Sequence, residues 1–598
     1  MSEATTTTTT MTEQTEAAPP QLTTTETETT EKGMEEGTAP ATTTSEGAPS
    51  KTGLKVLFLS SDTGGGHRAS AESLAKQFQL LFPGTTYDLA DMVENEGVPI
   101  YSSLVSYYKH LSAHPAQWKF LYEVTNSRAF ETIADTHLKL VCERLCRKTI
   151  RKMNPDVVVS VHPLMTNVPV LSCAKISQET GRHLPIFTVV TDLGSAHCLW
   201  FCNGVEKMFV GSDQIWKLAQ DRGKVPDEKL VMAGLPIRHD FAVQAELMGD
   251  RMSSEGKAYQ VSMRAELGLP FTDRKTLLVM GGGEGVGSLS NIVNTLYVEL
   301  VASGIDAVIL VVCGRNEKLQ KALTTRDWDQ VMVDYKNMKE NRGYSVGFGN
   351  LPGCGVQTTP TAGCIEGSVT TSIRRILSTG TLKMDSPLST ADLTNANNND
   401  TSNPVSEDGD EKKDMSPSED VLKATDTADA TNTKATSTVE VLPSGHTDGN
   451  FSFDGIIDND KPKGKVAVVS LGFVNKMAEY MVAADVLVSK AGPGTISEAA
   501  ALSLPVMLTS FLPGQEEGNV DFVTEGGFGA FCSDKDPTGI AEELVLWLND
   551  DATMERLSKA AKAKGAPHAA RDIAKAIGDS ALKWKELNDA KSKASVSS

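Results

Sequence analysis

The sequence predicts an α/β protein with two doubly wound, Rossmann-like domains that face each other across a cleft. Short apolar, β-branched runs alternate with helix-favouring segments, a pattern typical of parallel sheets covered by helices on both faces. The alternation stops in a charged stretch and then restarts. Each half opens on a glycine-rich turn between a strand and a helix, at Gly64–Gly66 and at Gly281–Gly283. Ligands of such sheets bind beyond the carboxyl ends of the strands, so we expect the site between the two domains.

The domain organisation follows from changes in composition along the 598 residues. A Thr/Glu-rich tail comes first, and a Thr/Ser/Asn/Asp-rich stretch interrupts the second half. Neither can bury a core, so we expect both to be disordered. The predicted parts are a disordered tail (1–52), a first domain (53–242), a connector with one short helix (243–272), a second domain in two pieces (273–352 and 464–590) and a disordered acidic insertion (353–463).

The alternation places the individual elements. In the first domain it predicts strands at 56–60, 157–161, 186–191 and 208–210, with helices at 69–82 and 132–153. In the second domain it predicts strands at 277–280, 307–313, 466–470, 486–489 and 505–508, with helices at 291–303, 476–483, 495–502, 538–548 and 569–587.

Charge and cysteine content exclude some classes of protein. The formal net charge is −20, but residues 1–50 contribute −8 and residues 385–450 contribute −10. The predicted folded part is therefore nearly neutral, and it lacks the clustered basic run of a nucleic-acid-binding protein. The nine cysteines are scattered, with Cys142/Cys146 and Cys198/Cys202 as the close pairs. We favour buried thiols over a zinc site, which stays open as an alternative. No apolar run approaches the roughly 20 residues that span a bilayer, so membrane contact would be peripheral.

Two glycine turns are candidate sites. His67 follows Gly64–Gly66 at the start of a helix, where it is placed to act as a base. The second turn opens another helix, whose free N–H groups and dipole favour a phosphate. Its residues are Gly492, Pro493, Gly494 and Thr495.

Polar residues near the second turn suit a sugar nucleotide. Glu498 is placed to accept hydrogen bonds from a ribose diol, although a carboxylate that merely stabilises the helix is the alternative. Gln515, Glu516 and Asn519 follow the next strand in a glycine-flanked loop and suit hydroxyl groups, although a polar surface loop is the alternative. The sequence has no Gly-x-x-x-x-Gly-Lys-Ser/Thr motif, and the Gly281–Gly287 run fits a dinucleotide fingerprint only loosely.

Several blocks together resemble the monogalactosyldiacylglycerol synthase family. The resemblance covers residues 54–548 apart from the insertion, and the blocks occur in the family's order. They are Ser61–Glu72, Ser160–Met165, Val190–Leu193 with Trp200-Phe201, Gly234–Arg238, Met280–Gly285, Cys313–Asn316, Lys490–Ile496 and Gly514–Glu516.

The family resemblance implies a glycosyltransferase-B fold and the inverting transfer of galactose from UDP-galactose to 1,2-diacylglycerol. His67 then matches the base that deprotonates the acceptor hydroxyl, and Asp192 is a candidate to assist it. The resemblance implies no required cofactor and no metal site, because the leaving UDP is stabilised by a helix start and Arg238. The residues so assigned to the UDP-sugar are Arg238, Gly283, Gly472, Phe473, Val474, Gly492, Pro493, Gly494, Thr495, Ile496, Glu498, Gln515, Glu516 and Asn519.

The first domain takes the acceptor and the membrane surface in this interpretation. The residues assigned to the acceptor or lipid are Gly65, Gly66, Pro99 and Trp200. The aromatic stretch 98–122 is the expected membrane contact, since Trp and Tyr favour the bilayer interface. The family's Trp-Pro pair is replaced here by Val98-Pro99. An anionic lipid as activator and a homodimer are further expectations, and no nucleic-acid partner is expected.

Location and activity leave alternatives. The resemblance implies the plastid envelope membrane, with peripheral attachment, yet the first 50 residues carry no recognisable targeting signal. The alternative activities are a related lipid glycosyltransferase that uses UDP-glucose or UDP-N-acetylglucosamine, an inactive binding module, and a nicotinamide oxidoreductase.

Overall fold

The structure is a computed structural model that describes residues 53–61, 66–91, 110–111, 114–281, 289–341 and 463–596. The described residues belong to one compact unit. The predicted tail, nearly all of the predicted insertion, and the site residues Gly65, Pro99 and Gly283 lie outside the described residues.

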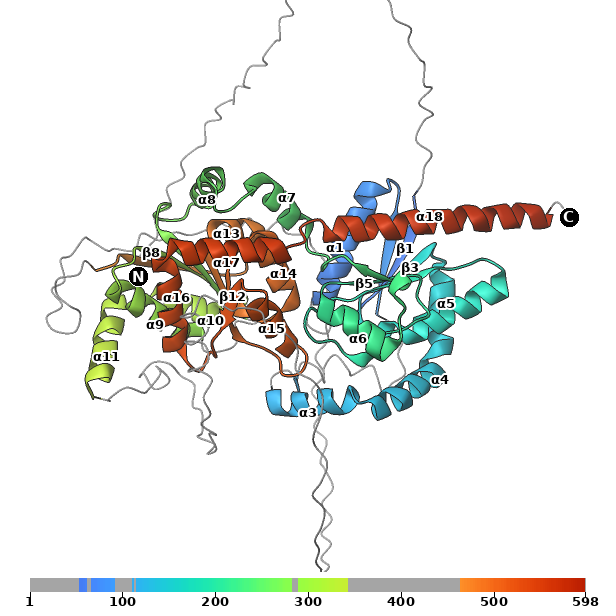
Figure 1. Ribbon diagram of the computed structural model, residues 1–598, viewed down its shortest axis with the longest axis horizontal. Helices are drawn as coiled ribbons and strands as arrows, with labels where there is room; N and C mark the ends of the chain where they lie inside the picture. Colours follow the sequence, from blue (N-terminus) through green and yellow to red (C-terminus); the bar gives the residue numbers. More distant parts are fainter. Residues whose placement is uncertain are drawn as a thin grey trace, which may run out of the picture. The chain divides into compact units, whose positions relative to one another are not determined.

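The first half of the chain forms a six-stranded parallel sheet with the order β2-β1-β3-β4-β5-β6 (Figure 1). Its strands are β1 (Lys55–Leu59), β2 (Thr86–Ala90), β3 (Val157–Ser160), β4 (Ile186–Val189), β5 (Met208–Val210) and β6 (Leu230–Met232). Its helices are α1 (Gly66–Leu81), α3 (Pro115–Thr125), α4 (Arg128–Met153), α5 (Asn167–Thr180) and α6 (Asp213–Gly223), with short turns η1 (Pro163–Met165), η2 (Cys198–Trp200) and η3 (Asp227–Lys229).

The side chains of β1 show why this sheet is covered on both faces. Val56 and Phe58 point into a core that includes α1, whereas Leu57 and Leu59 point into a core that includes α4 and α5. All four are completely buried. Alternate residues of a strand face opposite sides, so an unbroken apolar run requires helices on both.

The second half forms another six-stranded parallel sheet, with the order β12-β11-β10-β7-β8-β9. Its strands are β7 (Lys275–Met280), β8 (Ala307–Val312), β9 (Val466–Leu471), β10 (Val486–Lys490), β11 (Val506–Ser510) and β12 (Gly529–Phe531). Its helices are α9 (Leu289–Ala302), α10 (Glu317–Thr324), α11 (Trp328–Asn341), α13 (Met477–Ala483), α14 (Pro493–Ala501), α15 (Glu517–Glu525), α16 (Pro537–Asn549) and α17 (Asp551–Lys564). Two parallel α/β sheets confirm the predicted fold class.

The last helix, α18 (Ala569–Val596), returns to the first sheet (Figure 1). Its buried residues Ile573 and Ile577 lie in the core that β1 and α1 share. A Cβ atom at Gly578 would lie 2.1 Å from Cε2 of Phe82, so the glycine permits the close approach of α18 to the end of α1.

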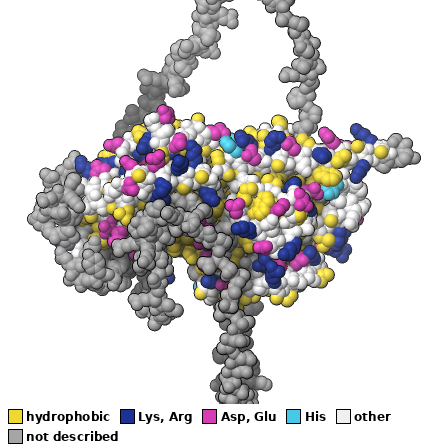
Figure 2. Space-filling view, viewed as in Figure 1, with side chains coloured by type: hydrophobic (Ala, Val, Ile, Leu, Met, Phe, Trp, Pro, Cys, Tyr) yellow, Lys and Arg dark blue, Asp and Glu magenta, His cyan; other side chains and the backbone are white. Residues whose placement is uncertain are grey.

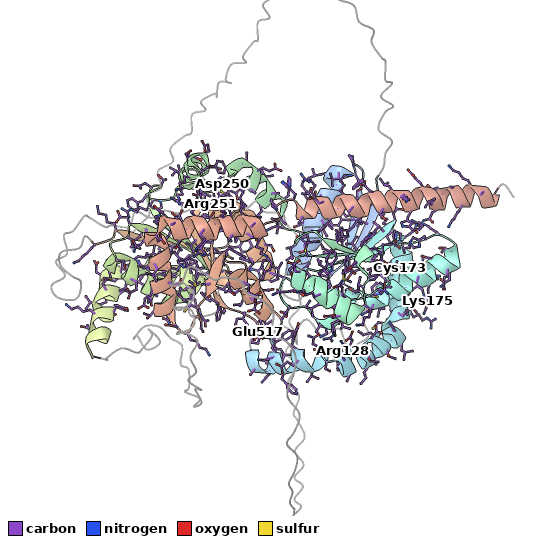
Figure 3. The ribbon with its side chains drawn as sticks, in the orientation of Figure 1. Arg128, Cys173, Lys175, Asp250, Arg251 and Glu517 are labelled. Atoms are coloured by element: carbon purple, nitrogen blue, oxygen red, sulfur yellow. The ribbon has the colours of Figure 1, made fainter. Side chains whose placement is uncertain are left out.

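The predicted connector (243–272) contains the helix α8 (Ser254–Glu266) and the end of α7 (His239–Met248), which begins inside the predicted first domain. Gly249 ends α7 with φ +66°, and Ser253 caps α8 by accepting a hydrogen bond from the N–H of Gly256. Between them Arg251 is buried and donates to the carbonyl oxygens of Met481, Val482, Ala484 and Leu502 (Figure 3). The connector is thus fixed to the second half by charge-assisted hydrogen bonds.

No helix within the described ranges is long and apolar enough to cross a membrane.

Candidate active site

Five side chains gather at the carboxyl ends of the neighbouring strands β1, β3 and β4. His67 is the second residue of α1, and its Nδ1 lies 2.9 Å from Oγ1 of Thr191, just beyond β4. The ring of His162, just beyond β3, meets the ring of His67 edge-on at 4.6 Å between centroids. Asp192 accepts a hydrogen bond of 2.7 Å from Nε1 of Trp200. The carboxyl ends of central strands are where such sheets bind ligands.

Burial sets the charge of the two predicted catalytic residues. It lowers the pKa of His67 to about 4, and a hydrogen bond with the backbone of Val161 opposes this shift. His67 is therefore neutral at pH 7, which is the form that can accept a proton. Burial also raises the pKa of Asp192 to about 7, with Trp200 lowering it and Glu516 raising it further. Opposite shifts in one cluster are typical of functional sites.

Thr191 is a functional candidate that sequence reasoning missed. It was Asp192 that the sequence singled out to assist His67, but Thr191 makes the hydrogen bond to the ring. Thr191 is buried, so this contact fixes the orientation of the imidazole. A threonine after a strand carries no distinctive signal, although its position beside Asp192 in a recognised block could have suggested it.

Two hydroxyl groups at the end of β1 have no partner among the described residues. Oγ of Ser60 and Oγ of Ser61 are buried and make no hydrogen bond. An unsatisfied buried polar group in a native structure needs an explanation, and a ligand is one. They precede α1, the helix that begins with Gly66 and His67.

The second half supplies a helix N-terminus as predicted. Gly492 is the N-cap residue of α14, without a side-chain hydrogen bond to the helix, and Pro493 is its first helical residue. Gly494 and Thr495 follow in the first turn, whose N–H groups have no carbonyl partners within the helix. Ile496 is fully buried in the core behind them. Its side chain anchors the helix, so any contact with a donor would come from its backbone.

Arg238, the N-cap residue of α7, and Glu498 of α14 form a bidentate ion pair. Nε and Nη2 of Arg238 lie 2.7 and 2.9 Å from the two carboxylate oxygens. Burial raises the pKa of Glu498, and Arg238 opposes that shift. The sequence assigned both residues to the UDP-sugar but did not predict that they pair. Glu498 is the sixth residue of α14, so a role in stabilising the first turn of the helix does not explain it.

The loop after β11 has its polar groups engaged by protein. Glu516 binds Nζ of Lys490 at 2.6 Å and the N–H of Leu512 at 2.9 Å. Asn519 is fully buried, accepts from the N–H of Gly194 and donates to the carbonyl of Ala491. The carbonyl of Gln515 accepts from Oγ of Ser195. These contacts fix the loop.

The contacts of Asn519 and Gln515 join the two halves at the candidate site. They connect residues 194–195, which follow Asp192, to the loop assigned to the donor. A Cβ atom at Gly518 would lie 2.3 Å from the carbonyl carbon of Gly194, so two glycines are needed where the backbones meet. The predicted acceptor and donor residues are thereby brought together.

The remaining predicted residues differ in exposure. Phe473 follows β9 and is 65% exposed, between the partly buried Gly472 and Val474. Trp200 is fully buried. Its indole N–H donates to Asp192. Gly66 begins α1 with open space where a side chain would stand.

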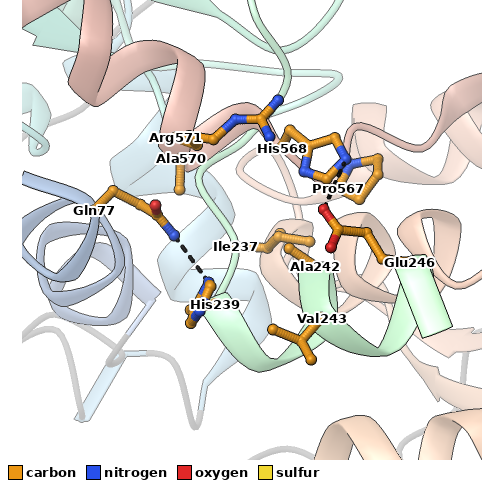
Figure 4. Close-up of a pocket in the computed structure, with 10 residues that line it drawn as sticks. All are labelled: Gln77, Ile237, His239, Ala242, Val243, Glu246, Pro567, His568, Ala570 and Arg571. Atoms are coloured by element: carbon orange, nitrogen blue, oxygen red, sulfur yellow. Dashed lines mark hydrogen bonds and ion pairs between the residues drawn. The ribbon is translucent and has the colours of Figure 1, made fainter. Parts of the chain in front are cut away.

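A pocket of about 100 Å³ lies elsewhere, where the chain passes between the halves (Figure 4). Gln77 and His239 form a hydrogen bond of 3.1 Å on one side, and Glu246 and His568 approach to 3.5 Å on the other. None of the predicted site residues lines it.

In the described part of the chain, no group of three or more His, Cys, Asp or Glu side chains could hold a metal ion. The four cysteines of the two close pairs are free thiols.

The two parallel sheets agree with the predicted glycosyltransferase-B fold, with a buried histidine beside one sheet and a free helix start beside the other. In agreement, residues 452–577 match the family model "Glycosyltransferase family 28 C-terminal domain". Residues 67–237 match the family model "Monogalactosyldiacylglycerol (MGDG) synthase". The resemblance to the monogalactosyldiacylglycerol synthase family is thereby confirmed.

Curated relatives extend this similarity over most of the chain. "Probable monogalactosyldiacylglycerol synthase 2, chloroplastic" from Oryza sativa subsp. indica is 27% identical, with 87% of this chain and 80% of the relative covered. "Monogalactosyldiacylglycerol synthase 1, chloroplastic" from Arabidopsis thaliana is 25% identical, with 82% of this chain and 64% of the relative covered. Among solved structures, MurG of Acinetobacter baumannii aligns with 10% identity and a TM-score of 0.42, over 88% of this chain and 99% of its own.

Proposed function

We propose that the protein transfers galactose from UDP-galactose to the free hydroxyl of 1,2-diacylglycerol, with inversion at the anomeric carbon. The observation that carries the proposal is the buried cluster of His67, Thr191 and Asp192, joined through residues 194–195 to the loop that we assign to the donor. The similarity to monogalactosyldiacylglycerol synthases supports the choice of donor and acceptor.

On the acceptor side, His67 is the base. Its neutral ring takes the proton of the diacylglycerol hydroxyl as the oxygen attacks the anomeric carbon. Thr191 holds the ring in one orientation, and Asp192, ionised above its pKa of about 7, stabilises the imidazolium that forms. The unpaired hydroxyls of Ser60 and Ser61 are available to the acceptor's polar head.

On the donor side, the breaking bond leaves negative charge on the diphosphate of UDP. In this proposal the N–H groups at the start of α14, around Gly494 and Thr495, and the guanidinium of Arg238 stabilise that charge, as helix starts and cations do at other anion sites. Glu498 accepts from the ribose hydroxyls and keeps Arg238 oriented. Phe473, exposed beyond β9, provides a face for the uracil ring.

In the same proposal the enzyme works peripherally on the plastid envelope membrane. The relatives are named chloroplastic, and a diacylglycerol acceptor resides in a bilayer. An anionic lipid as activator and a homodimer are further parts of this proposal.

The test is a donor-by-acceptor assay. Purified protein is incubated with UDP-galactose, UDP-glucose or UDP-N-acetylglucosamine and with vesicles that contain diacylglycerol, and the lipid products are identified. We expect β-galactosyldiacylglycerol from UDP-galactose. A preference for another donor would overturn the assignment.

A pair of histidine variants tests the base. His67→Ala should lose activity by about 10²-fold or more while it still binds UDP. His568→Ala, which changes a histidine beside Glu246 and outside the cluster, should retain activity. Full activity of His67→Ala would remove His67 as the base.

A further inference from the structure

Large apolar side chains are exposed along α3 and α4. Phe120 is 70%, Ile133 68% and Leu140 80% exposed. Leu121, Val124 and Leu145 on the same two helices are exposed by more than a third. Single exposed apolar residues are ordinary, but a group on two consecutive helices indicates a surface that meets something apolar.

The outward face of α4 combines these apolar residues with cations. Ile133, Leu140, Arg144 and Lys148 follow helical spacings of seven, four and four residues and therefore share one face. Arg144 and Lys148 are exposed, and neither pairs with an acidic side chain of the described chain. We call these four residues, with Phe120, Leu121 and Val124 of α3, the α3–α4 face.

The acidic residues of α4 lie away from this face. Glu131 pairs with Arg222, and Asp135 pairs with Lys139. Glu143 is buried. On α3 the exposed Glu123 lies beside Phe120 and Val124 and pairs with Lys119, so the two cations of α4 leave the face with a positive balance. Apolar and cationic side chains lie along the lower edge of Figure 2, where Figure 1 shows α3 and α4.

The opposite side of α3 contacts the candidate site. Tyr122 is buried, and a Cβ atom at Gly514 would lie 2.6 Å from its ring. Gly514 begins the turn that carries Gln515 and Glu516. Burial raises the pKa of Tyr122, and the charge of Asp192 raises it further. One helix thus presents apolar side chains to the outside and a tyrosine to the donor loop.

We propose that the α3–α4 face docks on the surface of an anionic bilayer and so brings the acceptor site to its lipid. This inference rests on the proposed function, because that function places the acceptor in a membrane. Apolar side chains interspersed with Lys and Arg are what an interfacial helix needs, and each cation near an anionic surface strengthens binding about fivefold.

A second copy of the chain fits this face less well. A twofold contact would bury the patch of both copies in one interface, and so would bring together Arg144 and Lys148 of each copy without an acidic partner from α4. Charged residues are also depleted in the centre of protein interfaces. Residues 92–109 of the same chain, outside the described residues, are the other occupant that the test addresses.

The experiment measures vesicle binding by cosedimentation of the full chain. The vesicles are phosphatidylcholine with or without phosphatidylserine. Arg144→Glu with Lys148→Glu should weaken binding to the anionic vesicles by about 30-fold or more. Ile133→Ser with Leu140→Ser should weaken binding to both kinds of vesicle. Wild-type protein should prefer the anionic vesicles.

Matched controls change similar residues outside the face. Leu247→Ser with Leu546→Ser removes two exposed leucines, which are 60% and 64% exposed. Lys318→Glu with Lys321→Glu reverses two exposed charges on α10. Both control pairs should bind vesicles like the wild type.

Activity separates this inference from the function on which it rests. The face variants should lose activity on diacylglycerol in vesicles and keep it on a short-chain diacylglycerol in solution. If all face variants bound vesicles as strongly as the wild type, the inference would be overturned even if galactose transfer were confirmed. The inference would also be overturned if the wild type formed a dimer that dissociates only in the face variants. It would likewise be overturned if the face could be crosslinked to residues 92–109 while the protein is bound to vesicles. Vesicle binding without any transfer would overturn the proposed function alone.

Discussion

Replacement of Asp192 by asparagine should stabilise the folded protein above pH 7, although Asp192 belongs to the candidate active site. The side chain is 6% exposed, and burial raises its pKa from 3.8 to about 7. Between these two values the folded protein binds more protons than the unfolded chain. The free energy of unfolding therefore falls as the pH rises through this window, and the ionised carboxylate opposes folding above it.

The magnitude follows from the same two values. A pKa difference from 3.8 to about 7 corresponds to a ceiling of about 4 kcal/mol when each pKa unit is worth about 1.4 kcal/mol. Asparagine removes the charge and keeps an oxygen that accepts the hydrogen bond of Trp200. The increase in the free energy of unfolding of Asp192→Asn over the wild type should reach its full value at pH 8 and be smaller by about 2–3 kcal/mol at pH 5.

The assay is urea unfolding at pH 5 and pH 8, followed by far-UV circular dichroism. Asp221→Asn, which changes an exposed aspartate on α6, is the control and should leave stability unchanged at both pH values. Equal stability of Asp192→Asn and wild type at pH 8 would refute the reasoning. A lower free energy of unfolding of Asp192→Asn at both pH values would also refute the reasoning, because it would mean that the carboxyl group stabilises the fold.

Three other substitutions test separate contacts. Thr191→Val should lower kcat by about tenfold because the base loses its orienting hydrogen bond, and Thr191→Ser should restore it; an unchanged kcat would show that the contact is incidental. Gly518→Ala should lower the thermal midpoint by several degrees because its Cβ would strike backbone, whereas Gly66→Ala, where the space is open, should not; equal midpoints would contradict the close approach. Glu498→Gln should weaken UDP binding in calorimetry by about tenfold more than pyrophosphate binding, because both ligands lose the orientation of Arg238 but only UDP also loses the ribose contact; equal losses for both ligands would exclude a ribose contact.

The architecture was predictable because the signals that determine it are local. An apolar β-branched run such as Val157–Ser160 can be satisfied in few ways, and it is a buried strand in the structure. The glycine turns before His67 and Pro493 correctly indicated where α1 and α14 begin, because a strand that ends in a tight glycine turn is commonly followed by a helix.

What could not be predicted depends on pairing across the chain. Arg238 and Glu498 are 260 residues apart, and neither neighbourhood indicates the other. The amphipathic pattern of α18 predicts a helix with one buried face but not which sheet covers it. Thr191 was missed for the same reason, because its role depends on His67, 124 residues earlier.

The return of α18 to the first sheet has a consequence for biosynthesis. The core shared by β1 and α1 is completed by Ala570, Ile573 and Ile577, which leave the ribosome after nearly all of the second half. The first sheet therefore emerges without part of its apolar cover, and domains that emerge early usually fold early. The nascent chain carries an exposed apolar surface until α18 is made. Truncation before Ala569 should therefore damage the half of the protein that is made first, and not only the half from which residues are missing.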